Sequence, residues 1–285
     1  MELITIVLSS LLTIVGGGGW ILDAIAHKQL NSVIDSAEEL EVRIDNNPNY
    51  QIAQGKLDKL RVAGRGIYLD PDLRIAAVDL ETDAIALDIA RLETTSLEKI
   101  RGSLVQPLQG AFSLTLTEAD LGNALNSAEI QAKLESLLND LIASRAGNTT
   151  IAYDLVDPTL DFQDDNQLTF AVTLRRLNEP VRKNQASELN LVLDIGLEMV
   201  SGKQLVIREL VGTVNNRPMS SRLLNGFAQG ISDRLDFSNL EKQGIFARLL
   251  QLEITAEKIT IVGFAKMETK SALINSQKLT TIVRE

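Results

Sequence analysis

The segment from Phe112 to Ser127, FSLTLTEADLGNALNS, constrains the fold more than any other part of the chain because its periodicity changes partway along. As far as Leu116, apolar residues alternate with serine and threonine, which is the pattern of a half-buried β-strand. Thr117 and Asp120 then have the spacing of a capping box, whose side chains satisfy free backbone N–H groups where a helix begins. The sequence therefore predicts a strand that runs directly into a helix, with no catalytic residue type at the junction.

The predicted helix continues to about Ser144 and carries an apolar face that must be covered. A second helix of the same character is predicted after Pro218, because proline is favoured in the first turn of a helix. We interpret the two apolar faces as candidate lipid-contacting surfaces. Their residues are Leu121, Leu125, Ile130, Leu134, Leu138, Leu223, Leu224, Phe227 and Ile231. At each of these positions the alternative is plain hydrophobic core.

Long alternating strands make up most of the remaining chain. A hairpin is expected over 56–82 around Asp70-Pro71-Asp72, and Gly64 and Gly66 in its first strand indicate a bulge or a close backbone approach. Further strands are expected at 149–155, 167–177, 187–200 and 204–214, followed by a short helix at 239–250 and a last strand at 252–264. These elements predict an α+β fold in which one long, strongly curved antiparallel sheet wraps around the amphipathic helices. Such a sheet could hold an elongated apolar groove, or side chains could fill it completely.

The composition excludes several classes of function. A net charge of −10 argues against nucleic-acid binding and against electrostatic docking to anionic headgroups, since both need clustered lysine and arginine. The chain has no cysteine and only one histidine, His27, which excludes thiol catalysis, cysteine-ligated metals and sites built from several histidines. An enzyme would have to work with carboxylates, hydroxyls or lysines alone. We therefore expect no enzyme, no catalytic or metal-binding residues and no cofactor.

Two charged clusters have both a functional and an ordinary interpretation. Arg175 and Arg176, with 182–183 nearby, form the densest basic patch and could contact a phosphate headgroup, although surface charge on a loop is the ordinary and favoured explanation. Asp157, Asp161 and the pair 164–165 form an acidic cluster whose spacing is not that of an EF-hand. A solvated turn between strands is the simpler interpretation of that cluster.

The N-terminal segment has no charged residue from Leu3 to Leu22, and a helix of that length reaches about 30 Å, enough to cross a bilayer. Three interpretations remain open: a membrane anchor, a signal peptide cleaved near Ala24-Ile25-Ala26, or a segment that packs on the protein or lies in the membrane surface. The four glycines at 16–19 disfavour a straight helix in water. An amphipathic helix is expected to follow, over 23–40.

Several segments resemble, in the same order, the LmeA-like phospholipid-binding family, which is common in cyanobacteria and actinobacteria. LTEADL followed by NALNS resembles the signature segment of that family. The other matching segments are Gly55–Asp58, Val62–Gly66, Leu80–Asp83 and Ile231–Asp236, and the opening MELITIVLSSLLTIV is similar to that of a cyanobacterial subset. The resemblance covers about 36–264 and implies a lipid-binding fold with a phospholipid or a similar amphiphile as the partner.

We therefore expect a membrane-associated protein of the cell envelope that holds a phospholipid by its acyl chains, with a role in lipid transfer or envelope maintenance. Residues 1–35 would form the anchor or signal segment with its amphipathic helix, 36–267 the lipid-binding domain, and 268–285 a loosely held tail. The alternative is a membrane-anchored scaffold with a solid core and no ligand. The oligomeric state is left open.

Overall fold

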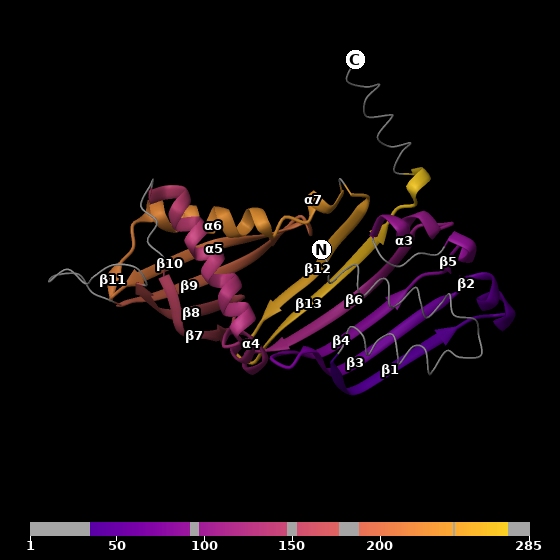
Figure 1. Cartoon of the computed structure of the whole chain (residues 1–285), viewed down its shortest axis with the longest axis horizontal. Helices are drawn as coiled ribbons and strands as arrows, with labels where there is room; N and C mark the ends of the chain where they lie inside the picture. Colours follow the sequence, from indigo (N-terminus) through magenta and orange to yellow (C-terminus); the bar gives the residue numbers. More distant parts are fainter. Residues whose placement is uncertain (1–34, 92–96, 147–152, 177–187, 242, 273–285) are drawn as a thin grey trace, which may run out of the picture.

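The structure is a computed structural model that describes residues 35–91, 97–146, 153–176, 188–241 and 243–272. It confirms an α+β fold built mainly from antiparallel strands. The strands do not form the one sheet that was predicted. They form a six-stranded sheet in the order β1-β3-β4-β6-β13-β12 and a five-stranded sheet in the order β11-β10-β9-β8-β7, which lie at opposite ends of the long axis (Figure 1).

The six-stranded sheet is assembled from three separated parts of the chain. Its strands are β1 (Ser36–Asp45), β3 (Lys59–Asp70), β4 (Leu73–Thr82), β6 (Leu108–Thr117), β12 (Ile245–Ile254) and β13 (Lys258–Met267). The predicted hairpin is confirmed as β3 and β4, and the strand predicted to end at Leu116 is confirmed as β6. Because the sequence alternates along these strands, most apolar side chains lie on one face and most charged or hydroxyl side chains on the other, although Val262 and Phe264 of β13 lie on the second face.

Short elements cover one end of this sheet, and the main hydrophobic core lies between them and the strands. They are the 3-10 helices η1 (Asn49–Gln54) and η2 (Ile89–Arg91), strands β2 (Lys56–Leu57) and β5 (Ile85–Ala86), and helices α3 (Leu97–Ser103) and α7 (Ser238–Glu241). Leu57, Leu60, Ile85 and Ile100 are fully buried there. We refer to this end as the cap.

The five-stranded sheet carries two helices on one face. Its strands are β7 (Tyr153–Gln163), β8 (Gln167–Arg176), β9 (Glu188–Val200), β10 (Gln204–Val214) and β11 (Arg217–Pro218). Leu134 of α5 (Ala128–Ala146) and Leu224 of α6 (Ser221–Arg234) both pack against the same cluster of buried residues from β7, β8 and β9. The apolar faces of these helices therefore complete a second core.

The junction between the two sheets is formed by α4 (Glu118–Leu125) and by turn residues. The predicted capping box is confirmed: the Thr117 hydroxyl accepts from the backbone N–H of Asp120, and the Asp120 carboxylate accepts from the backbone N–H of Thr117. The Glu118 carboxylate accepts from the backbone N–H of Phe162 at 2.7 Å. Asn166 accepts from the backbone N–H of Ile254 at 2.8 Å, which ties the β7–β8 turn to β12.

Three predictions of local structure are wrong. The helix expected at 239–250 is limited to α7, because Gly244, with φ of 68°, ends it and the alternating sequence that follows pairs with β13 as β12. In place of the single last strand predicted at 252–264, the structure therefore has a hairpin of two strands, β12 and β13. The long helix expected to Ser144 is broken, since the Ser127 hydroxyl accepts from the backbone N–H of Ile130 and starts α5 anew. Of the helix expected at 23–40, residues 23–34 lie outside the described residues. Its end is not helical, because β1 begins at Ser36.

Candidate functional site

The apolar face of the six-stranded sheet has a central part that no helix of the described structure covers (Figure 1). One row of cross-strand neighbours, paired in register across the sheet, runs over all six strands: Leu40, Gly64, Val78, Leu114, Ile261 and Leu252. The next row toward α4 adds Leu116 and Ile259, which are paired with each other. We call the side chains of these two rows the apolar band. Every apolar side chain named in it is half-buried.

Helices contact this face only near its ends in the part of the chain that the structure describes. The cap packs on the end formed by Leu60 and Leu108, and Val62 and Leu80 also pack against that core. At the opposite end, α4 packs against β4 and β6. Between them no helix of the described elements lies over the middle of the six-stranded sheet (Figure 1). A surface of this kind is typical of a binding site for an apolar ligand.

The opposite face of the same sheet carries ion pairs along β3 and β4. Lys59 and Arg61 both bind Glu81, at 2.6 Å and 2.8 Å, and Arg65 binds Asp79 at 3.0 Å. The hydrogen bonds from Lys59 and Arg61 lower the pKa of Glu81 to about 2, so the carboxylate stays ionised. The two faces therefore differ in polarity, as expected of a sheet that faces solvent on one side and an apolar environment on the other.

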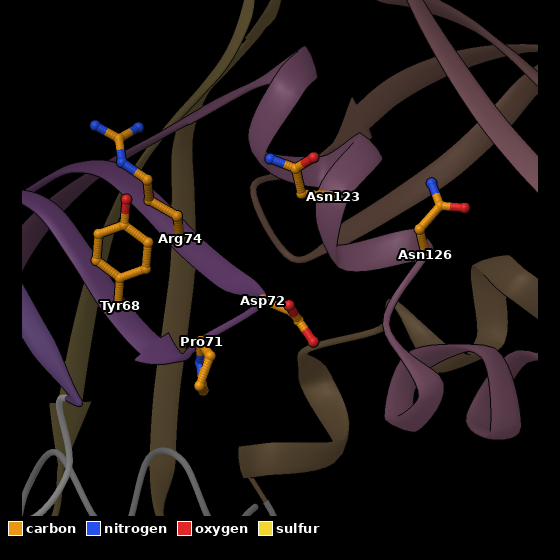
Figure 2. A pocket seen from close by; sticks show the side chains of 6 residues that line it. All are labelled: Tyr68, Pro71, Asp72, Arg74, Asn123 and Asn126. Carbon is orange, nitrogen blue, oxygen red and sulfur yellow. The ribbon is translucent and has the colours of Figure 1, made fainter.

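A polar pocket lies at the α4 end of the apolar face. Its volume is about 330 Å³, and it is lined by Tyr68, Pro71, Asp72, Arg74, Asn123 and Asn126 (Figure 2). The first four come from the ends of β3 and β4 and the turn between them, and the two asparagines come from α4 and its C-terminus. Arg74 and Val78 are four residues apart in a regular strand, so both side chains lie on the apolar face.

Arg74 is the only cation among the pocket residues, and two carboxylates neutralise it. Its Nη1 lies 2.9 Å from Oδ1 of Asp120, and its Nη2 lies 3.0 Å from Oε1 of Glu38. These hydrogen bonds raise the pKa of Arg74, that to Asp120 most. Burial raises the pKa of Asp120, but hydrogen bonds from Thr117 and Arg74 outweigh it, so the pKa lies below its ordinary value.

Most of the helix residues predicted to line a groove lie on helices that pack against the five-stranded sheet. Leu134 and Leu224 pack in the core of the five-stranded sheet, as the alternative interpretation allowed. Leu121, Leu125, Ile130, Phe227 and Ile231 are half-buried, Leu223 is exposed, and the side chain of Leu138 lies outside the described residues. Leu121 and Leu125 are on α4, next to the six-stranded sheet. The role of these residues in lipid contact stays a prediction.

The basic patch lies on the five-stranded sheet, whereas the turn with Asp164 contacts the β12–β13 turn, where Asp164 accepts from the backbone N–H of Ala256. Arg175 is exposed on β8 and pairs with Glu188 of β9 at 3.1 Å, and Arg176 follows it at the end of that strand. Of the acidic cluster, Asp157 and Asp161 lie within β7, and only the pair 164–165 lies in the turn that follows it. Among the described residues no group of histidine, aspartate and glutamate side chains is arranged to hold a metal ion.

Comparison with known families gives a direct match. The sequence model of a family described as LmeA-like phospholipid-binding matches residues 15–264, a stretch that includes every strand of both sheets except the end of β13. The chain belongs to the LmeA-like phospholipid-binding family. The resemblance of the LTEADL and NALNS segments to this family is thereby confirmed. No curated protein matches the chain. None of the helices within the described residues is long and apolar enough to cross a membrane.

Sequence reasoning missed the apolar band, although each strand of it was visible as an alternating pattern. The band exists only because the register brings Leu40, Val78 and Ile261 into one row, and a single sequence does not specify which strands are neighbours. The polar pocket was missed for the same reason. The available signal was the change from apolar residues to Tyr68 and Arg74 at the turn between β3 and β4.

Proposed function

We propose that this protein binds phospholipid by laying the acyl chains on the apolar band of the six-stranded sheet. The observation that carries the proposal is a row of residues that crosses all six strands, with half-buried apolar side chains on five of them and Gly64 on β3, and without a covering helix in the described structure, in a chain of a phospholipid-binding family. Each methylene group removed from water contributes about 0.8 kcal/mol, so the binding free energy should grow with the length of acyl chain that the band covers.

The proposal is tested by placing a charge on either face of one strand. Leu114→Asp puts a carboxylate into the band, whereas Thr115→Asp puts the same carboxylate on the polar face one residue away. Each protein is incubated with phospholipid vesicles and separated from them, and the lipid that remains bound is extracted and measured by mass spectrometry. We expect Leu114→Asp to lose most of the bound lipid and Thr115→Asp to retain it, with circular dichroism showing that both are folded.

Equal lipid loading of the two folded variants would overturn the proposal. If neither the parent protein nor the variants took up lipid, the alternative of a scaffold with no ligand would replace it. The matched pair removes the general effect of an added negative charge, because the two carboxylates are on adjacent residues.

We also propose that the protein is associated with the membrane on the envelope side through its N-terminal segment, in support of lipid transfer or envelope maintenance. The support is the uncharged stretch from Leu3 to Leu22, which lies outside the described residues. Fractionation of cells that express the chain with and without residues 1–34 tests this. Loss of the protein from the membrane fraction on deletion is expected, and an unchanged distribution would contradict it.

A further inference from the structure

The apolar face of the six-stranded sheet changes in polarity along its strands. At the cap the face is closed by buried aliphatic residues, among them Leu60 and Leu108. The middle is the apolar band. At the α4 end, β3 and β4 carry Tyr68 and Arg74 instead, and Glu38 of β1 reaches Arg74 from the same side. An elongated amphiphile on this face would therefore find its apolar environment toward the cap and its polar environment toward α4.

The pocket at the α4 end offers both donors and acceptors, and Asp72 is its only anionic group. Asn126 donates one side-chain N–H to the carbonyl of Gly122 at 2.8 Å, which fixes its amide at the edge of the pocket. Asp72 is exposed in the turn, and no ion pair to it is found among the described residues. Figure 2 shows Asp72 between the turn and the asparagines of α4. A carboxylate in this position suits a ligand group that donates hydrogen bonds or carries positive charge.

The charges around the pocket favour a cation as well. Arg74 is already bound by Glu38 and Asp120, and Asp72 adds a third carboxylate, so negative charge is in excess. An anionic headgroup would meet Asp72 without an unpaired cation in the pocket to balance it. An ammonium group would instead gain from this excess, and the effect would weaken with salt because Asp72 is exposed.

We propose that the pocket lined by Tyr68, Asp72, Asn123 and Asn126 receives the ammonium end of a zwitterionic phospholipid headgroup, with the acyl chains directed along the apolar band toward the cap. This inference rests on the proposed function and adds two statements to it, the direction of the lipid and the class of its headgroup. Phospholipids whose headgroup carries only negative charge bind less well.

The direction of the lipid is tested by photo-crosslinking on the full chain. Vesicles of phosphatidylcholine contain a small fraction of a probe lipid with a diazirine either in the headgroup or at the end of an acyl chain, and crosslinked peptides are mapped by mass spectrometry. The headgroup probe is expected on peptides with Pro71–Asp72 or Asn123–Asn126, and the acyl probe on those with Leu80 or Phe112. The reverse pattern would overturn the inference, and the absence of crosslinks to this sheet would instead contradict the proposed function.

The headgroup class is tested with acyl-chain probes that carry either phosphatidylcholine or phosphatidylglycerol headgroups. We expect crosslinking to the sheet to favour the phosphatidylcholine probe by about threefold at low salt, the size expected of one exposed charge pair. Asp72→Asn should bring the ratio close to one. Asp194→Asn, an exposed aspartate on β9 of the other sheet, removes the same charge and should leave the ratio unchanged. Equal labelling by both probes in the parent protein, or equal effects of the two variants, would overturn the headgroup assignment.

Discussion

At the scale of single residues, Asp120 takes part both in the cap of α4 and in a tertiary contact with β4. It caps α4 through Thr117 and binds Arg74 of the neighbouring sheet, and its side chain is only 5% exposed. We expect Asp120→Asn to lower the free energy of unfolding by about 1–3 kcal/mol at neutral pH, since it removes a charged partner of hydrogen bonds. Urea denaturation of the variant and the parent measures this difference.

The effect of Asp120 depends on pH in a defined direction. Folding lowers its pKa, so its contribution is complete above the ordinary value of 3.8 and is lost as the pH falls through the lower folded value. The difference between Asp120→Asn and the parent should therefore shrink below pH 3.8. Glu38→Gln, which alters the more exposed carboxylate bound to Arg74, is the control and should cost less than about 1 kcal/mol. Equal losses in the two variants would contradict this assignment.

Gly66 of β3 occupies a position in the sheet that has no room for a side chain. Its φ is 55°, and a Cβ atom there would lie 2.1 Å from the carboxylate carbon of Glu38. We expect Gly66→Ala to lower the free energy of unfolding by more than about 1 kcal/mol, because it combines backbone strain with displacement of Glu38. Gly122→Ala on α4 meets no atom within 4 Å and should stabilise the protein. Thermal denaturation compares the two, and a stable Gly66→Ala would show that the close approach is not required.

At the scale of elements, the helix faces and the sheet face make opposite predictions about lipid binding. Phe227 on α6 represents the helix-lined groove expected from the sequence, and Leu114 on β6 represents the apolar band. If the band is the site, Leu114→Asp should remove bound lipid while folded Phe227→Asp retains it. The mass-spectrometric assay for extracted lipid distinguishes the two sites. Loss of bound lipid in Phe227→Asp alone would contradict the apolar band and support the helix-lined groove.

The elements themselves could be predicted well where one pattern decided them. The alternation and the capping spacing around Thr117 predicted both β6 and the start of α4, and the bounds of β10 were predicted without error. The segment after Glu241 was mistaken for a helix because its strand character depends on pairing with β13. Neither the bulge nor the close backbone approach expected at Gly64 and Gly66 is found there, because the sheet keeps its register and the atoms that crowd both positions belong to side chains.

At the scale of the whole molecule, the division into two sheets explains why the site was hard to foresee. β6 and β13 are distant in the sequence but adjacent in the six-stranded sheet, while the intervening chain builds the five-stranded sheet. Local patterns gave the fold class and the kinds of elements, whereas the long-range pairing that forms the apolar band depends on the packing of the whole chain. Sheet residues rather than helix residues therefore became the main candidate site.

The central claim, that phospholipid lies on the apolar band, is tested most directly with single cysteines introduced into this cysteine-free chain. Leu114→Cys on the band and Thr115→Cys on the polar face are each labelled with a fluorophore and mixed with vesicles whose acyl chains carry a nitroxide quencher. Quenching of the label at residue 114 with little effect at residue 115 is the predicted result. Equal quenching at both positions, or none at residue 114 in a folded protein, would contradict the claim.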